Sequence, residues 1–263
     1  MCKTGRLAVV SSFNAHFGEE DPLVGEHGSG TIFFAHCNLL CNFCQNYEIS
    51  HLGEGSEITN EQLAYFMLEL QRAGCHNINL VTPTHVTAQI LGALCIAADN
   101  GLQIPVVYNS GGYDSVETLK LLEGAVDIYM PDFKFWDPQV ADQTCSAPDY
   151  PEIAQAALLE MHRQVGDLTI GADGLASSGL LVRHLVLPGG MAGTKEVMTF
   201  IASQVSPRTY VNIMPQYRPC GKAAEIPALS SPLSGTEFQT AIQEAKDAGI
   251  KRFDRRRPKF AIW

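Results

Sequence analysis

The chain has 263 residues, of which 46% are hydrophobic and 17% are charged, and its formal net charge is -10. This length suits one α/β domain or two small ones, and the acidic balance argues against a general nucleic-acid-binding role. No apolar run reaches the roughly 18–20 residues of a membrane helix, and residues 1–10 lack the pattern of a signal peptide. We therefore expect a cytoplasmic protein that does not bind a membrane.

Short apolar runs along the chain predict buried β-strands, and each is followed by a helical pattern or a long loop. The expected strands cover residues 31–35, 77–82, 105–108, 126–130, 180–187 and 210–214. Helices are expected over 59–74, 86–98, 115–122, 153–165, 195–205 and 236–248. Thr59 and Thr236 are the expected N-caps of the first and last helices. Residues 136–151 and 218–235 are expected to be loops.

This alternation predicts the fold class. Strands that are apolar throughout are typical of parallel sheets covered on both faces, so we expect an α/β protein, either a doubly wound sheet or a partial barrel. No repeat or low-complexity linker divides the chain. We expect an N-terminal extension over 1–30, a core over 31–217, and a C-terminal loop, helix and basic tail over 218–263, packed on the core. The basic residues near the C-terminus are interpreted as a solvated end.

Polar side chains gather just after the expected strands. Outside the cysteines they are Thr82, Thr84, His85, Asn109, Ser110, Asp132, Lys134 and Gln216. The carboxyl ends of parallel strands meet at one edge of the sheet, which is where α/β proteins bind ligands. The pattern favours an enzyme over a scaffold.

Three cysteines lie in one loop after the first expected strand. Cys37, Cys41 and Cys44 have three and then two residues between them. Thiolates are soft ligands that suit zinc or iron–sulfur clusters, and three ligands leave such a site one short. The alternative is a structural zinc site completed by His36 or His51. The residues between these cysteines are largely apolar, unlike those of common zinc knuckles.

The other cysteines are scattered singly along the chain. They are Cys2, Cys75, Cys95, Cys145 and Cys220. A chain of this length does not need disulfides to stabilise its core. We interpret the last four of these residues as buried small hydrophobes or incidental thiols. Cys2 is interpreted as an ordinary exposed thiol, with a stranded ligand as the alternative.

With these residues assembled, the chain resembles the radical S-adenosylmethionine (radical SAM) superfamily, whose hallmark is Cys-x3-Cys-x2-Cys after the first barrel strand. Within it the chain is similar to the pyruvate formate-lyase activating enzyme-like group, in particular a subgroup without an assigned substrate. Asn109-Ser-Gly-Gly resembles the Asp-Thr-Asn-Gly turn of those enzymes, and Asp132-Phe-Lys134 resembles their Asp-Leu-Lys. The strand that carries Arg183 and is followed by Pro188-Gly189 also resembles the Arg-containing strand of those enzymes with its Pro-Gly end. The resemblance spans about residues 31–214.

The resemblance implies a partial (β/α)6 TIM-like barrel of parallel strands. It implies a [4Fe-4S] cluster held by Cys37, Cys41 and Cys44, with S-adenosyl-L-methionine as the second cofactor. Reductive cleavage of that cofactor would yield a 5'-deoxyadenosyl radical that abstracts hydrogen from a substrate. The implied partners are an electron donor such as flavodoxin or ferredoxin, and a glycyl radical enzyme or another protein substrate. The alternatives are radical modification of a peptide, metabolite or RNA base, and a non-catalytic zinc-binding α/β domain.

The resemblance also suggests cofactor contacts. Phe43, the aromatic residue before the last cysteine, is expected near the adenine. Thr82 and Thr84 stand where activating enzymes carry Gly-Gly-Glu, so hydroxyls or backbone carbonyls would meet the cofactor's ammonium. Asn109 replaces a carboxylate that helps bind a monovalent cation, which argues against a cation site. Ser110 and Gln216 complete the expected cofactor-binding rim.

Three charged residues have two interpretations each. Asp132 and Lys134 are either a surface ion pair at a strand end or part of the cofactor site. Arg183 lies within an apolar strand, where an unpaired charge is costly, so we expect a buried partner or the cofactor carboxylate. His184 should face the opposite side of the strand as a packed structural histidine.

Overall fold

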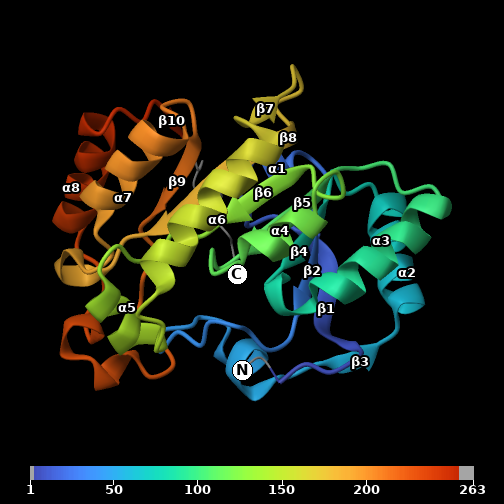
Figure 1. Cartoon of the computed structure of the whole chain (residues 1–263), viewed down its shortest axis with the longest axis horizontal. Coiled ribbons are helices and arrows are strands. Elements are labelled where there is room, and N and C mark those ends of the chain that lie inside the picture. The colour runs from blue at the N-terminus through green and yellow to red at the C-terminus, as the bar shows by residue number, and fades with distance from the viewer. Residues whose placement is uncertain (1–2, 255–263) are drawn as a thin grey trace.

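The computed structural model describes residues 3–254, which form a ten-stranded sheet with helices packed along it (Figure 1). Its centre consists of parallel strands in the order β9, β8, β6, β5, β4, β2. These are β2 (Ser29–Phe34), β4 (Ile78–Val81), β5 (Val106–Ser110), β6 (Ile128–Pro131), β8 (Ala176–Leu185) and β9 (Tyr210–Met214). Each matches an expected strand, and the sheet of the described residues is not closed. The predicted α/β partial barrel is confirmed.

The sheet continues beyond this parallel centre. On one side β1 (Ala8–His16) pairs antiparallel with β2 and with β3 (Ser56–Ile58), and on the other β10 (Arg252–Phe253) runs parallel to β9. β7 (Thr169–Ile170) pairs antiparallel with β8. The sequence analysis did not predict β1, because only its first residues are buried and its second half faces solvent.

Helices cover the sheet in groups. α2 (Asn60–Arg72) and α3 (Thr87–Asp99) pack together beside β2 and β4, whereas α7 (Thr194–Phe200) and α8 (Gly235–Asp247) pack together at the β8 and β9 end (Figure 1). Between them α4 (Val116–Leu121) contacts α6 (Tyr150–Val165), which lies over β6 and β8. The short helix α1 (Asp21–Val24) places the fully buried Leu23 among inward-facing strand residues.

Short 3-10 and π turns connect these elements. The π turns are η1 (Glu48–Leu52) and η4 (Ile201–Val205). The 3-10 turns are η2 (Thr84–Val86), η3 (Pro188–Gly190), η5 (Ala223–Glu225) and η6 (Pro227–Leu229). The helix expected over 195–205 thus ends as a π turn.

Two local predictions were wrong. The segment expected to be an irregular loop contains α5 (Pro138–Cys145), because Asp137 accepts a hydrogen bond from the Gln139 amide and proline suits the first helical position. The N-cap of α8 is Ser234 rather than Thr236, since Ser234 and Glu237 form a capping box. The predicted cap at Thr59 is confirmed, with Gln62 completing the capping box.

The remaining expectations concern membrane spans, domain boundaries and the two ends of the chain. No helix within residues 3–254 is long and apolar enough to cross a membrane. The boundaries at residues 30 and 217 stay predictions, although β1 and β10 pair with strands of the core. Cys2 and the basic residues 255–257 lie outside the described residues.

Candidate active site

The three cysteines lie in the loop that follows β2, at the carboxyl end of the sheet. Cys41 is buried, whereas Cys37 and Cys44 are half-buried. The Cys37 sulfur accepts a hydrogen bond from the Leu39 amide at 3.3 Å, and the Cys44 sulfur lies 3.1 Å from the hydroxyl of Ser50. The loop is therefore ordered by its own backbone and by η1.

Burial has the largest effect on the pKa of two of the three thiols, Cys37 and Cys44. Burial raises the pKa of Cys37 to about 12 and also raises the pKa of Cys44. The pKa of Cys41 is raised first by a hydrogen bond to Cys145 and then by burial. The Lys134 ammonium opposes these shifts at all three sulfurs by favouring the thiolate.

The donor chemistry of this loop fits an iron–sulfur cluster. Three thiols lie close enough that their charges interact, and a cation stands beside them to balance thiolate charge. Among residues 3–254, no three His, Cys, Asp or Glu side chains are already arranged to hold a metal ion. Cys37, Cys41 and Cys44 must therefore move toward one another to share a cluster.

Segments from distant parts of the chain hold the loop in place. The Asn42 amide donates to the Thr144 carbonyl at the end of α5, and the Asn42 carbonyl accepts from the Lys222 amide at 2.6 Å. The Gln45 side chain donates to the Gln216 carbonyl at 3.1 Å. The position of the cysteine loop thus depends on the end of α5 and on the segment that follows β9.

Four of the predicted site residues form one buried polar network. Asp132 accepts from the Lys134 ammonium at 2.6 Å and from Arg183 Nε at 2.8 Å. Arg183 also donates to the Asn109 side chain at 2.7 Å, and its guanidinium lies 3.6 Å from a Glu19 oxygen. The structure gives Arg183 the buried partner that its place in an apolar strand predicted.

Charge pairing decides the protonation of this network. Burial alone would raise the pKa of Asp132, but Arg183 and Lys134 hold it below its ordinary value. Burial would lower the pKa values of Lys134 and Arg183, yet Asp132 outweighs it and both are raised. The pair Asp132–Lys134 is less than one-fifth exposed on either side, so the interpretation as a surface ion pair is wrong.

A second network surrounds Asp114, which the sequence analysis did not single out. Its buried carboxylate accepts from Thr84 at 2.7 Å, from Ser110 at 2.6 Å and from Tyr108 at 3.1 Å. Burial nevertheless raises the pKa of Asp114. The hydroxyl protons of Thr84 and Ser110 therefore point to Asp114 in this structure.

The remaining predicted residues lie around these networks. Thr82 has a positive φ of 61°, which is costly for a β-branched residue, and its amide donates to the Asn109 carbonyl. Phe43 is buried against the rings of Phe135 and Tyr217, at 5.9 and 6.0 Å between centroids. Gln216 joins the cysteine loop through Gln45. The cofactor roles of all these residues stay predictions.

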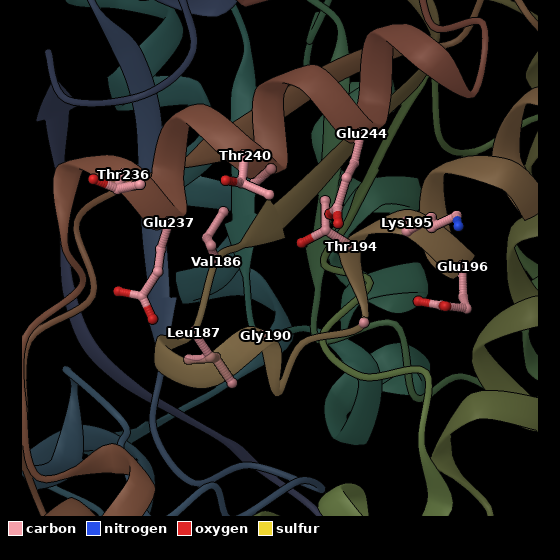
Figure 2. Close-up of a pocket in the computed structure, with 12 residues that line it drawn as sticks. Val186, Leu187, Gly190, Thr194, Lys195, Glu196, Thr236, Glu237, Thr240 and Glu244 are labelled. Carbon is pink, nitrogen blue, oxygen red and sulfur yellow. The ribbon is translucent and has the colours of Figure 1, made fainter.

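Two cavities lie near or beyond this rim. One of about 460 Å³ is bordered by Asn38 of the cysteine loop, Thr84 and Tyr113. Another of about 260 Å³ lies between the end of β8, α7 and α8, where Thr240 and Glu244 face Val186 and Thr194 (Figure 2). The second cavity includes none of the predicted site residues.

The family model of the radical SAM superfamily matches residues 31–175, which contain the cysteine loop, the Asp114 network, and Asp132 and Lys134 of the first network. The chain belongs to the radical SAM superfamily. Members of this superfamily use a [4Fe-4S] cluster and S-adenosylmethionine, and these are the cofactors of this radical SAM chain. The predicted membership and cofactors are confirmed.

The chain is also similar to individual proteins and solved structures. The radical SAM chain is 33% identical over 240 residues to the uncharacterized protein MJ0674 of Methanocaldococcus jannaschii, covering 88% of this chain but only 65% of that protein's length. It resembles the structure of HydG, a maturase of the [FeFe]-hydrogenase, with a TM-score of 0.53, 13% identity, and coverage of 81% and 47% of the two chains. A domain of a pyruvate-formate lyase-activating enzyme from Bacteroides vulgatus matches with a TM-score of 0.45, 17% identity, and coverage of 65% and 91%. The likeness to HydG concerns the fold.

Several residues at this site were missed by sequence reasoning. Cys145, Asp114, Ser50 and Glu19 each contact a predicted residue, although none shares a motif with it. Asp114 alone had a local signal, since it follows the Gly-Gly turn after β5. Cys145 and Glu19 meet the site through tertiary contacts, whereas Ser50 reaches Cys44 from the turn that follows the loop.

Proposed function

We propose that this chain is a radical SAM enzyme in which Cys37, Cys41 and Cys44 hold a [4Fe-4S] cluster. The observation that carries the proposal is the placement of three thiols from one loop beside the Lys134 ammonium, inside the segment that matches the superfamily. When bound, the cluster supplies the electron that cleaves S-adenosylmethionine to methionine and a 5'-deoxyadenosyl radical.

The chain's own residues would orient the cofactor and exclude water. Lys134 has three N–H donors and gives one to Asp132, so it is suited to a carboxylate as well. Arg183 is engaged by Asp132 and Asn109, which favours a role in holding that network rigid. The buried side chains of Phe43 and Cys41 keep solvent from one side of the loop.

We further propose that the substrate is a protein, with a glycyl radical enzyme as the leading candidate, and that flavodoxin or ferredoxin supplies the electron. Support comes from the motifs shared with activating enzymes at Asn109, Asp132 and Arg183. Because the chain spans 65% of the length of its curated relative, substrate and partner rest on these motifs alone.

The test of the reaction is anaerobic reconstitution with iron and sulfide. We expect a reducible cluster by EPR spectroscopy, and 5'-deoxyadenosine from S-adenosylmethionine after reduction with dithionite. Cys41→Ala should abolish both, whereas Cys95→Ala, which removes an exposed thiol on α3, should leave both unchanged. Zinc in the purified protein without a reducible cluster would contradict the proposal and restore the zinc-domain alternative.

The substrate class needs a separate experiment. A candidate partner protein labelled with α-deuterated glycine is incubated with the reduced enzyme and S-adenosylmethionine. Deuterium should appear in 5'-deoxyadenosine if the radical abstracts hydrogen from a glycine of that protein. Cofactor cleavage without deuterium transfer would leave the radical chemistry in place but point to a peptide, metabolite or RNA base.

A further inference from the structure

A buried serine joins one of the cysteines to a histidine. Ser50 lies in the π turn η1 and is 8% exposed, with its hydroxyl oxygen 3.1 Å from Cys44 Sγ and 2.8 Å from His51 Nδ1. Single π turns occur often at functional sites. Among the described residues, Cys44 is the only one of the three predicted ligands whose sulfur contacts a hydroxyl.

Binding of Cys44 to iron would fix which atoms donate and which accept in this chain of hydrogen bonds. A cysteine bound to iron is a thiolate, which only accepts hydrogen bonds. Because the serine hydroxyl has a single proton, Ser50 must donate it to Cys44 Sγ, and its oxygen is then free to accept from His51 Nδ1. The His51 ring is held by stacking on Tyr47, with centroids 4.2 Å apart and an angle of 15° between planes.

We propose that Ser50 is a positioning residue that raises the reduction potential of the cluster by donating a hydrogen bond to Cys44 Sγ, with His51 orienting its hydroxyl. The inference rests on the proposed function. A hydrogen bond to a ligand sulfur withdraws electron density and stabilises the reduced, more negative cluster. Burial of Ser50 excludes water, which would otherwise compete for the sulfur.

The experiment is a redox titration of the reconstituted protein, followed by EPR spectroscopy. Ser50→Ala should bind the same amount of iron as the wild type but show a lower midpoint potential, by up to about tenfold in the reduction equilibrium, which is about 59 mV for one electron. Ser50→Thr keeps the hydroxyl and should restore the wild-type potential. Ser230→Ala removes an exposed serine hydroxyl of the 218–235 segment and serves as the matched control.

His51→Phe provides a second variant if Ser50→Ala fails to fold. It keeps a ring beside Tyr47, removes Nδ1, and should lower the potential in the same direction. An unchanged potential in Ser50→Ala, or a lowered one that Ser50→Thr does not restore, would overturn the inference and leave the enzyme proposal intact. A wild-type protein without any reducible cluster would overturn both.

Discussion

Neighbouring residues on β8 illustrate how one strand serves two environments. Arg183 joins the polar network with Asp132, whereas His184 lies on the opposite face and is fully buried. His184 Nδ1 donates to the Phe133 carbonyl at 2.7 Å, and its Nε2 accepts from the Thr194 hydroxyl at 2.9 Å. The sequence alternation predicted this division. Burial lowers the pKa of His184 to about 4.

This histidine should make stability depend on pH. Between its ordinary pKa of 6.5 and about 4, the unfolded chain binds a proton that the folded chain does not. The free energy of unfolding should therefore fall as pH falls through this window, by roughly 3 kcal/mol from His184. Urea unfolding between pH 4 and 7 measures the slope.

Another group acts in the opposite direction in the same window. Burial raises the pKa of Asp254 to about 6, so its protonation stabilises the folded state as pH falls. The contribution of His184 is therefore read as the difference between the wild type and His184→Gln, with the exposed His27→Gln as control. Equal slopes in the wild type and His184→Gln would rule out the prediction.

At the scale of elements, the turn after β5 shows why two adjacent glycines differ. Gly112 has a positive φ of 77°, and a Cβ there would overlap the Asp132 carbonyl oxygen. At Gly111 a Cβ would find only ordinary contacts at 3.7 Å, to Leu39 and Lys134. The turn lets β5 and β6 bring Ser110 and Asp132 together at the rim.

The paired substitutions give a sharp test. Gly112→Ala should destabilise the fold by at least about 2 kcal/mol, because left-handed strain and backbone overlap add. Gly111→Ala should cost less than about 1 kcal/mol. Denaturant midpoints measure both, and similar losses for the two variants would show that the turn tolerates a side chain at Gly112.

At the scale of the whole molecule, the cysteine loop is a meeting point of three segments. Asn42 is bonded to Thr144 at the end of α5 and to Lys222 beyond β9, while η1 supplies Ser50 to Cys44. The end of α5 and the segment around Lys222 lie far from the loop in the sequence, whereas η1 follows the loop directly. Binding of a cluster should therefore reduce local opening at each of these segments, because it restrains the loop that they contact.

Hydrogen exchange can detect this coupling. Reconstitution should slow amide exchange at Asn42 and Lys222 several-fold, since their hydrogen bonds open only when the loop moves. Amides within α3 should exchange at the same rate with and without cluster, because their hydrogen bonds lie within the helix and not to the loop. Cys41→Ala treated identically should show no change. Uniform slowing across the chain would contradict the prediction.

The sequence by itself determined the six parallel strands of the sheet's centre, most helices, the cysteine loop and the order of polar residues along the rim. Those features depend on local spacing and apolar periodicity, which the chain carries within a few residues. The helix α5 was missed although Asp137 and Pro138 were a local start signal. Only the tertiary structure decided that Cys145 lies beside Cys41 and that Glu19 reaches Arg183. Such pairs come from packing between distant segments, and no spacing along the chain encodes which side chains then meet.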